Sequence, residues 1–134
     1  MKLMLDTHVL LWTIANDERL SPRARRIIED RDNDIFYSVV CLWEVQIKHQ
    51  SHPDKMQLDA SRLLDYCRRS GFRQVSVQAP HVLALGSLER HADAKPHHDP
   101  FDRIMICQAS SEGMLFLTHD KRLAEYTDPY VFAV

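Results

Sequence analysis

The sequence of 134 residues contains little glycine and no long apolar run. With only three glycines, it has no glycine-rich loop of the kind that cradles phosphate groups. Its longer apolar runs, such as VLLW and MLFL, are four residues long, far below the roughly 20 needed to span a membrane. The N-terminus carries one lysine and reaches Asp6 almost at once, which is not the pattern of a secretory signal peptide. We therefore expect neither a membrane segment nor a leader.

Closely spaced cysteine pairs are also absent. The three cysteines, Cys41, Cys67 and Cys107, are odd in number and form no C-x-x-C motif. This excludes a disulfide framework or a thiolate zinc site as the organising feature of the chain. The sequence instead predicts reduced and mostly buried thiols in a cytoplasmic protein.

An excess of basic charge, which most nucleic-acid-binding proteins show, is missing as well. The formal net charge is −2 at pH 7. Basic residues do cluster locally over Arg23–Arg26 and Arg68–Arg73. If several carboxylates bind a divalent metal, the formal count also overstates the negative charge that the protein presents. A solvated helix face explains both basic clusters at least as well as nucleic-acid binding does.

Short apolar segments alternate with segments of helical length along the whole chain. We predict strands over residues 2–6, 34–40, 72–78, 114–118 and 130–134. We predict helices over residues 7–17, 21–31, 40–50, 58–71, 80–89, 100–113 and 121–126. This alternation predicts one α/β domain with a mostly parallel central sheet flanked by helices on both faces. Ligands of such sheets bind beyond the carboxyl ends of the strands.

Four acidic residues belong to elements that can meet at this edge of the sheet. The first predicted strand ends at Asp6, and Asp120 follows the strand over 114–118. Asp102 lies in the first turn of the helix that leads into that strand, and Glu44 lies in the helix after the second strand. Clustered carboxylates raise one another's pKa unless a cation lies among them. A divalent metal is the simplest such cation, and ligation by oxygen alone suits Mg²⁺ or Mn²⁺, whose bound water can attack a phosphodiester.

Each acid also has a purely structural explanation. Asp6 and Asp120 precede predicted helices, and aspartate is a favoured N-cap residue. Glu44 is four residues before Lys48, a helical pair worth about 0.2–0.5 kcal/mol on a solvated face.

The apolar neighbours of Glu44 weaken its structural explanation. Val40, Cys41 and Ile47 lie three or four positions from Glu44 and share its side of the predicted helix. An acid among apolar neighbours needs a stronger partner than an exposed lysine.

The segment HHDPFDRIMICQA divides its two aspartates between these explanations. Asp99 followed by Pro100 is typical of a helix start, because the side chain caps and the proline ring presets φ. Asp102 could return a capping-box hydrogen bond, although glutamate or glutamine is usual there. Capping therefore explains Asp99 better than Asp102.

Histidines offer a competing interpretation of the same region. His97, His98 and His119 border the acids, and HHD with THD could form a His/Asp metal centre of the phosphohydrolase kind. Such centres usually take their ligands from helices, whereas Asp120 follows a strand. This hypothesis predicts hydrolysis of nucleotides or phosphoesters that depends on His97 or His98.

Four blocks of the sequence resemble PIN-domain ribonucleases of the VapC toxin type. They are LMLDTHVLLW, SVVCLWEVQIK, HHDPFDRIMICQA and LFLTHDKRLAEY, in this order over residues 3–126. Cys41-Leu42-Trp43-Glu44 replaces the more typical Ser-Leu-Trp-Glu, a change that leaves the acid in place. The resemblance implies a single PIN α/β domain over residues 1–134.

The resemblance also assigns roles to individual residues. It implies that an acidic quartet binds Mg²⁺ or Mn²⁺ and hydrolyses RNA to leave a 5′-phosphate and a 3′-hydroxyl. The matching quartet is Asp6, Glu44, Asp102 and Asp120. Supporting positions are Asp99, which caps the helix or contacts the metal through water; Thr7 and Thr118, as hydrogen-bond donors behind the acids; and Arg103, which contacts RNA phosphate or forms an ion pair.

The resemblance also implies protein partners. The resemblance implies a type II toxin–antitoxin system, in which a small cognate antitoxin blocks the acidic site, and it implies a homodimer. The alternative of a different class is a catalytically silent PIN-like module that binds RNA or protein. The presence of all four acids favours the enzyme.

Overall fold

A five-stranded, fully parallel sheet organises the computed structural model, which describes residues 1–134. The strands follow the order β3-β2-β1-β4-β5, and every neighbouring pair is parallel. Their bounds are β1 Lys2–Leu5, β2 Asp34–Ser38, β3 Arg73–Val75, β4 Leu115–Thr118 and β5 Val131–Ala133. This confirms the α/β class and sharpens the predicted mostly parallel sheet to an entirely parallel one.

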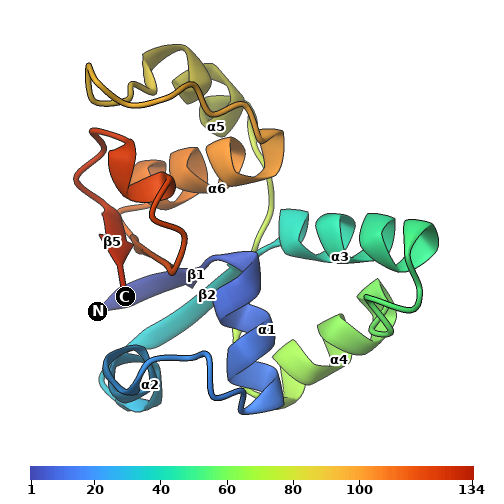
Figure 1. Cartoon of the computed structure of the whole chain (residues 1–134). Coiled ribbons are helices and arrows are strands. Elements are labelled where there is room, and N and C mark those ends of the chain that lie inside the picture. The colour runs from blue at the N-terminus through green and yellow to red at the C-terminus, as the bar shows by residue number, and fades with distance from the viewer.

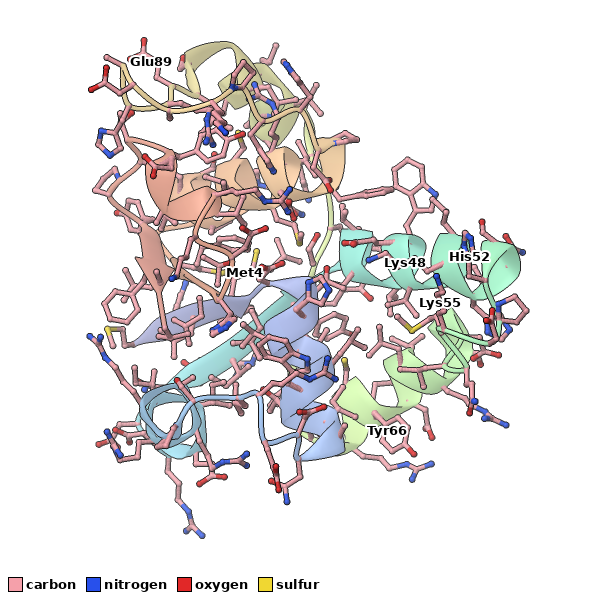
Figure 2. All side chains as sticks on the ribbon, in the orientation of Figure 1. Met4, Lys48, His52, Lys55, Tyr66 and Glu89 are labelled. Carbon is pink, nitrogen blue, oxygen red and sulfur yellow. The ribbon has the colours of Figure 1, made fainter.

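The central strand β1 is buried on both faces. Leu3, Met4 and Leu5 have no exposed surface, and Met4 is paired in register with Phe36 of β2 and Phe116 of β4. Figure 2 shows Met4 in the middle of the molecule. A parallel sheet covered on both faces requires such a continuous apolar strand, because neither face meets water.

Helices cover the two faces in separate groups. Figure 1 shows α1, α2 and α4 on one side of the sheet and α5 and α6 on the other, while α3 extends from the end of β2. The helices are α1 Thr7–Ala15, α2 Pro22–Glu29, α3 Val39–Ser51, α4 Ala60–Arg69, α5 Ala79–Ala84 and α6 Pro100–Ser111, with 3₁₀ turns η1 Leu85–Ser87 and η2 Leu123–Glu125. None of these helices has both the length and the apolar character needed to cross a bilayer.

The order of the strands reverses beside β1. The chain builds outward from β1 to β2 and β3, and then returns to place β4 and β5 on the opposite side of β1. At such a switch point the connections leave two adjacent strands in opposite directions, which opens a crevice beyond their carboxyl ends. Asp6 directly follows β1, and Asp120 lies two residues past the end of β4. The topology therefore places both acids at this crevice.

The second strand is shorter than predicted. The prediction extended it to Val40, but β2 ends at Ser38 and the two following valines begin α3. The Ser38 hydroxyl caps this helix by accepting a hydrogen bond from the Val40 N–H at 3.0 Å. The cap and the following turns outweigh the strand preference of two β-branched residues.

Three other segments are shorter in the structure than predicted. The helix predicted over residues 80–89 is only α5 with η1, the one over 121–126 is only η2, and the strand over 72–78 is limited to β3. In the two helical segments, few residues are available to offset the cost of helix nucleation. The predicted cap at Ser21 is confirmed by its hydrogen bond from the Ala24 N–H, and all three cysteines are buried as predicted.

Candidate functional site

The first acid, Asp6, is held from across the sheet. It occupies the N-cap position of α1, but its side chain makes no capping hydrogen bond. Instead Asp6 Oδ2 accepts a hydrogen bond from Thr118 Oγ1 at 2.7 Å, and the residue is only 3% exposed. The capping explanation is therefore wrong for Asp6.

Glu44 is buried on α3 rather than solvated. Its Oε1 accepts a hydrogen bond from Thr7 Oγ1 at 2.9 Å, and its Oε2 pairs with Lys48 Nζ at 2.9 Å. Cys41 shares its buried side, but Ile47 is 39% exposed and does not, so that neighbour was wrongly predicted. Glu44 has the second partner that its apolar surroundings predicted, in addition to the lysine labelled in Figure 2.

The two aspartates of α6 have different surroundings. Asp99 is the N-cap, and its Oδ1 accepts from the N–H groups of Phe101 and Asp102 at 2.9 and 3.2 Å. Asp102 returns no capping-box hydrogen bond and is buried. Its Oδ2 lies 3.3 Å from Nε2 of His97, in a geometry that makes no hydrogen bond. Asp99 therefore starts the helix, and the capping-box explanation is wrong for Asp102.

Asp120 is the most exposed of the four acids and has a local partner. Its Oδ1 accepts from the Arg122 N–H at 2.9 Å, and its Oδ2 pairs with Arg122 Nη2 at 2.7 Å. These hydrogen bonds lower the pKa of the Asp120 carboxyl. Here the capping explanation holds in part, because the carboxylate does stabilise the turn that leads into η2.

The four acids are close enough to perturb one another. The pKa of Asp102 is raised to about 8, first by burial and then by the negative charges of Asp6, Asp99, Glu44 and Asp120. Burial likewise raises the pKa of Asp6, although the hydrogen bond from Thr118 opposes this. Carboxylates that repel one another in this way gain most from a cation placed among them.

The acids suit a divalent cation in charge and donor type but do not yet enclose one. Carboxylate oxygens are the donors that Mg²⁺ and Mn²⁺ favour. However, no three acid, histidine or cysteine side chains are drawn together around one point. Glu44 and Asp120 are instead turned toward Lys48 and Arg122, whose side chains are 43% and 69% exposed. The residues therefore fit such an ion once these two carboxylates rotate away from their cations.

The two threonines connect the acids in a crossed pattern. Thr7 follows Asp6 in the sequence but donates to Glu44, while Thr118 precedes Asp120 but donates to Asp6. Thr118 Oγ1 also accepts from the Asp120 N–H at 3.0 Å. Each hydroxyl thus ties an acid to a neighbouring element, and these hydrogen bonds join the start of α1 to α3 and to the end of β4.

His97 borders the site and has a partner that the sequence did not indicate. It is buried, its Nδ1 lies 2.7 Å from the hydroxyl of Tyr126, and its Nε2 faces Asp102. Burial and then the nearby charges of Arg122 and Arg90 lower the pKa of His97, which favours a neutral ring. No sequence signal connects His97 with Tyr126, because the pair is 29 residues apart in the chain.

The other predicted residues, His98, His119 and Arg103, do not form a histidine metal centre. His98 is exposed, and His119 Nδ1 lies 2.9 Å from the carbonyl of Val134. His97 does reach Asp102, but no three histidine and acid side chains surround one point as the phosphohydrolase hypothesis requires. Arg103 forms no ion pair with an acid; its Nη1 donates to the Tyr126 hydroxyl at 3.3 Å.

Two hollows differ in their relation to the acids. One of about 210 Å³ opens at the crevice and is lined by Asp6, His8, Trp12, His119 and Asp120. A larger one of about 630 Å³, between α3, α5 and α6, is almost entirely apolar and contains none of the four acids. The smaller hollow therefore reaches two of the four acids, Asp6 and Asp120, whereas the larger one reaches none of them.

Comparisons with known proteins identify the family of the chain. The family model of the PIN domain matches residues 3–129. The chain is 29% identical over 132 residues to Ribonuclease VapC22 of Mycobacterium tuberculosis (strain ATCC 25618 / H37Rv), covering 94% of this chain and 92% of that protein. The fold is similar, with a TM-score of 0.67 and 16% identity, to the crystal structure of VapBC2 from Rickettsia felis bound to a DNA fragment from their promoter, over 100% of this chain and 98% of that one. The chain therefore belongs to the PIN-domain family.

Proposed function

We propose that this chain is a divalent-metal-dependent endoribonuclease and the toxin of a type II toxin–antitoxin pair, with residues 1–134 forming one PIN domain. The observation that carries the proposal is the convergence of four carboxylates, three of them buried, at the switch point of the sheet. The ribonuclease name of the relative from M. tuberculosis supports RNA as the substrate.

The proposal gives each acid a role. When bound, Mg²⁺ or Mn²⁺ supplies positive charge and activates water for attack on a phosphodiester. The buried Asp6 and Asp102 would hold the ion, and Glu44 and Asp120 would add further carboxylate ligands or orient the attacking water. Thr118 fixes the carboxylate of Asp6, and Thr7 does the same for Glu44. Asp99 supports the site by starting α6.

Removal and return of metal tests this function directly. Purified protein should cleave RNA with Mn²⁺, lose cleavage with EDTA, and recover it when Mn²⁺ is returned in excess. Asp102→Asn should abolish the recovery, because asparagine is a poorer metal ligand than aspartate. A silent PIN-like module would show no metal-dependent cleavage to lose. Cleavage by Asp102→Asn at the wild-type rate would contradict the site assignment.

The antitoxin is the partner that this proposal requires. A small protein that blocks the acidic site would keep the toxin inactive until it is removed. We expect a small open reading frame immediately upstream, and its product should suppress cleavage when added to the purified chain. A genomic neighbourhood without such a frame would count against the toxin assignment while leaving the nuclease assignment intact.

The larger hollow supports a homodimer. Trp43 is 62% exposed at its rim, and Val82 and Leu83 on α5 are 51% and 78% exposed. An apolar surface of this kind is characteristic of protein interfaces. We expect light scattering to report a dimer for the wild type and a monomer for Trp43→Asp. A wild-type monomer at all concentrations would remove the dimer from the proposal.

A further inference from the structure

A second polar hollow lies alongside the acidic crevice. It has a volume of about 310 Å³ and is formed by the loop that follows η1 and by the segment that follows β4. We call it the basic hollow; its lining residues are Arg90, Asp93, Ala94, Lys95, Lys121, Arg122 and Glu125. Four of these seven side chains are cationic and two are acidic.

The cations of the basic hollow are largely without partners. Arg122 pairs with Asp120 of the acidic site, but Arg90, Lys95 and Lys121 form no ion pair. Asp93 and Glu125 also line the hollow but form no ion pair, so the four cations outnumber the two acids. Unpaired cations around a concave surface attract an anion from solution.

One wall of the basic hollow is already fixed in place. The guanidinium of Arg90 lies 4.7 Å from the ring centroid of Tyr126, and its Nη1 donates to the carbonyl of Arg122 at 2.9 Å. The backbone of Arg90 also bridges to Tyr126. The Nε of Arg90 is buried without a hydrogen-bond partner. A positioned guanidinium loses little freedom when it binds an anion.

Two chains of contacts connect the basic hollow with the acidic crevice. Arg122 joins them directly through Asp120. A second connection runs from Arg90 through Tyr126 to His97, whose Nε2 lies 3.3 Å from Asp102 Oδ2. The basic hollow is therefore a neighbour of the carboxylates and not a separate surface patch.

The basic clusters that the sequence offered lie elsewhere. Residues 23–26 belong to α2, and residues 68–73 run from the end of α4 to the start of β3. The start of β3 is at the amino edge of the parallel sheet, opposite the crevice. Arg73 lines a polar hollow there together with Asp30 and Asp34. Neither cluster contributes a residue to the hollow that contains Asp6 and Asp120 or to the basic hollow.

We propose that the basic hollow binds a backbone phosphate of the RNA strand whose neighbouring phosphodiester enters the acidic crevice. The inference rests on the proposed use of RNA as substrate. Four carboxylates repel a polyanion, so nearby cations are needed to hold the strand at the site. Lysine and arginine bind phosphate through charge-assisted hydrogen bonds and give affinity without regard to sequence. An acidic segment of a partner protein is the competing ligand. The acidic crevice beside the basic hollow favours RNA, because that crevice is the proposed site of RNA hydrolysis.

The test compares two pairs of lysines in protein that binds RNA without cutting it. In an Asp102→Asn background, the Lys95→Gln/Lys121→Gln pair should raise the Kd for a fluorescent single-stranded RNA about tenfold, and the salt slope should fall by about 0.7 for each phosphate that the protein no longer neutralises. The matched control is Lys2→Gln/Lys55→Gln, which removes the same charge from exposed sites. Lys55 lies on the α3–α4 side in Figure 2, far from Glu89, the neighbour of Arg90. The control should keep Kd within about twofold.

Three outcomes separate this inference from the proposed function. Equal RNA affinity of the two lysine pairs would overturn the phosphate site, even if the wild-type protein cleaves RNA with Mn²⁺. If the Lys95→Gln/Lys121→Gln protein no longer binds an oligoglutamate peptide but still binds RNA, the phosphate site is overturned and an acidic protein partner is indicated. Loss of RNA binding in that protein, together with no cleavage by the wild type, would support the phosphate site and overturn the enzymatic proposal.

Discussion

Aspartates lie at both edges of the sheet, but their surroundings differ. At the amino edge, Asp30, Asp32 and Asp34 are exposed, and Asp30 accepts a hydrogen bond from the Asp32 N–H at 2.9 Å. At the carboxyl edge, Asp6 and Asp102 are buried and their pKa values are raised. The three acids at the amino edge lie in water and have no buried acid beside them, so they remain structural. Acids that are buried together acquire a shared need for a cation.

The largest expected difference between the edges is in the rate of RNA cleavage after an aspartate is replaced by asparagine. Asp6→Asn should reduce metal-dependent RNA cleavage by more than about 100-fold, because changes behind metal ligands already cost about 10–100-fold. Asp34→Asn, at the amino edge, should change the rate by less than about twofold. Single-turnover kinetics measure both, and circular dichroism verifies folding. Equal losses would remove the distinction between the edges.

The hydroxyl that holds Asp6 should have the next largest effect. Thr118→Val removes the donor at 2.7 Å from Asp6 Oδ2 with little change in shape, and we expect about a 10–100-fold loss of cleavage. Thr118→Ser keeps the donor and should recover most of the rate. A Thr118→Ser enzyme as slow as Thr118→Val would indicate that packing, and not the hydrogen bond, limits activity.

The pH dependence of stability should distinguish the edges without any substrate. Without metal, folded Asp102 keeps its proton up to a pKa of about 8, whereas the unfolded chain releases it near the ordinary aspartate pKa of 3.8. Between these values the folded state binds more protons, so the free energy of unfolding falls as pH rises. We expect the Tm in EDTA to fall by at least about 5 °C across this range.

Variants at each edge provide the controls for this pH dependence. Asp102→Asn should flatten the profile, because its side chain does not titrate, while Asp34→Asn should leave the slope unchanged. Added Mn²⁺ should raise the Tm most at the alkaline end, where the carboxylates are free of protons. A wild-type Tm that rises with pH in EDTA would contradict the burial of these acids.

The smallest effect should come from the helix start. Asp99→Ala removes the cap of α6 and should cost about 1 kcal/mol of unfolding free energy, while Asp99→Asn should cost little. Urea denaturation measures both. A loss of cleavage in Asp99→Asn at unchanged stability would show that Asp99 acts on the metal rather than on the helix.

The sequence predicted the alternation of elements well, because apolar runs and caps are local signals. It placed Asp6 and Asp120 at the carboxyl edge for the same reason. It missed the boundary at Ser38, where a hydroxyl cap decides against two β-branched residues. It could not predict which hydroxyl holds which acid, since Thr118 and Asp6 are 112 residues apart. Such pairings depend on the register of β1 with β4, which only the assembled sheet determines.

The same pairing makes the site depend on a segment that is synthesised long after Asp6. Thr118, which orients Asp6, lies in the last strand but one. During synthesis, the N-terminal half with Asp6 and Glu44 leaves the ribosome well before β4 can dock. A nascent chain therefore carries these acids without the geometry that joins them. A chain in which β4 has not yet docked beside β1 therefore lacks the hydrogen bond that orients Asp6, even when its N-terminal half has already emerged.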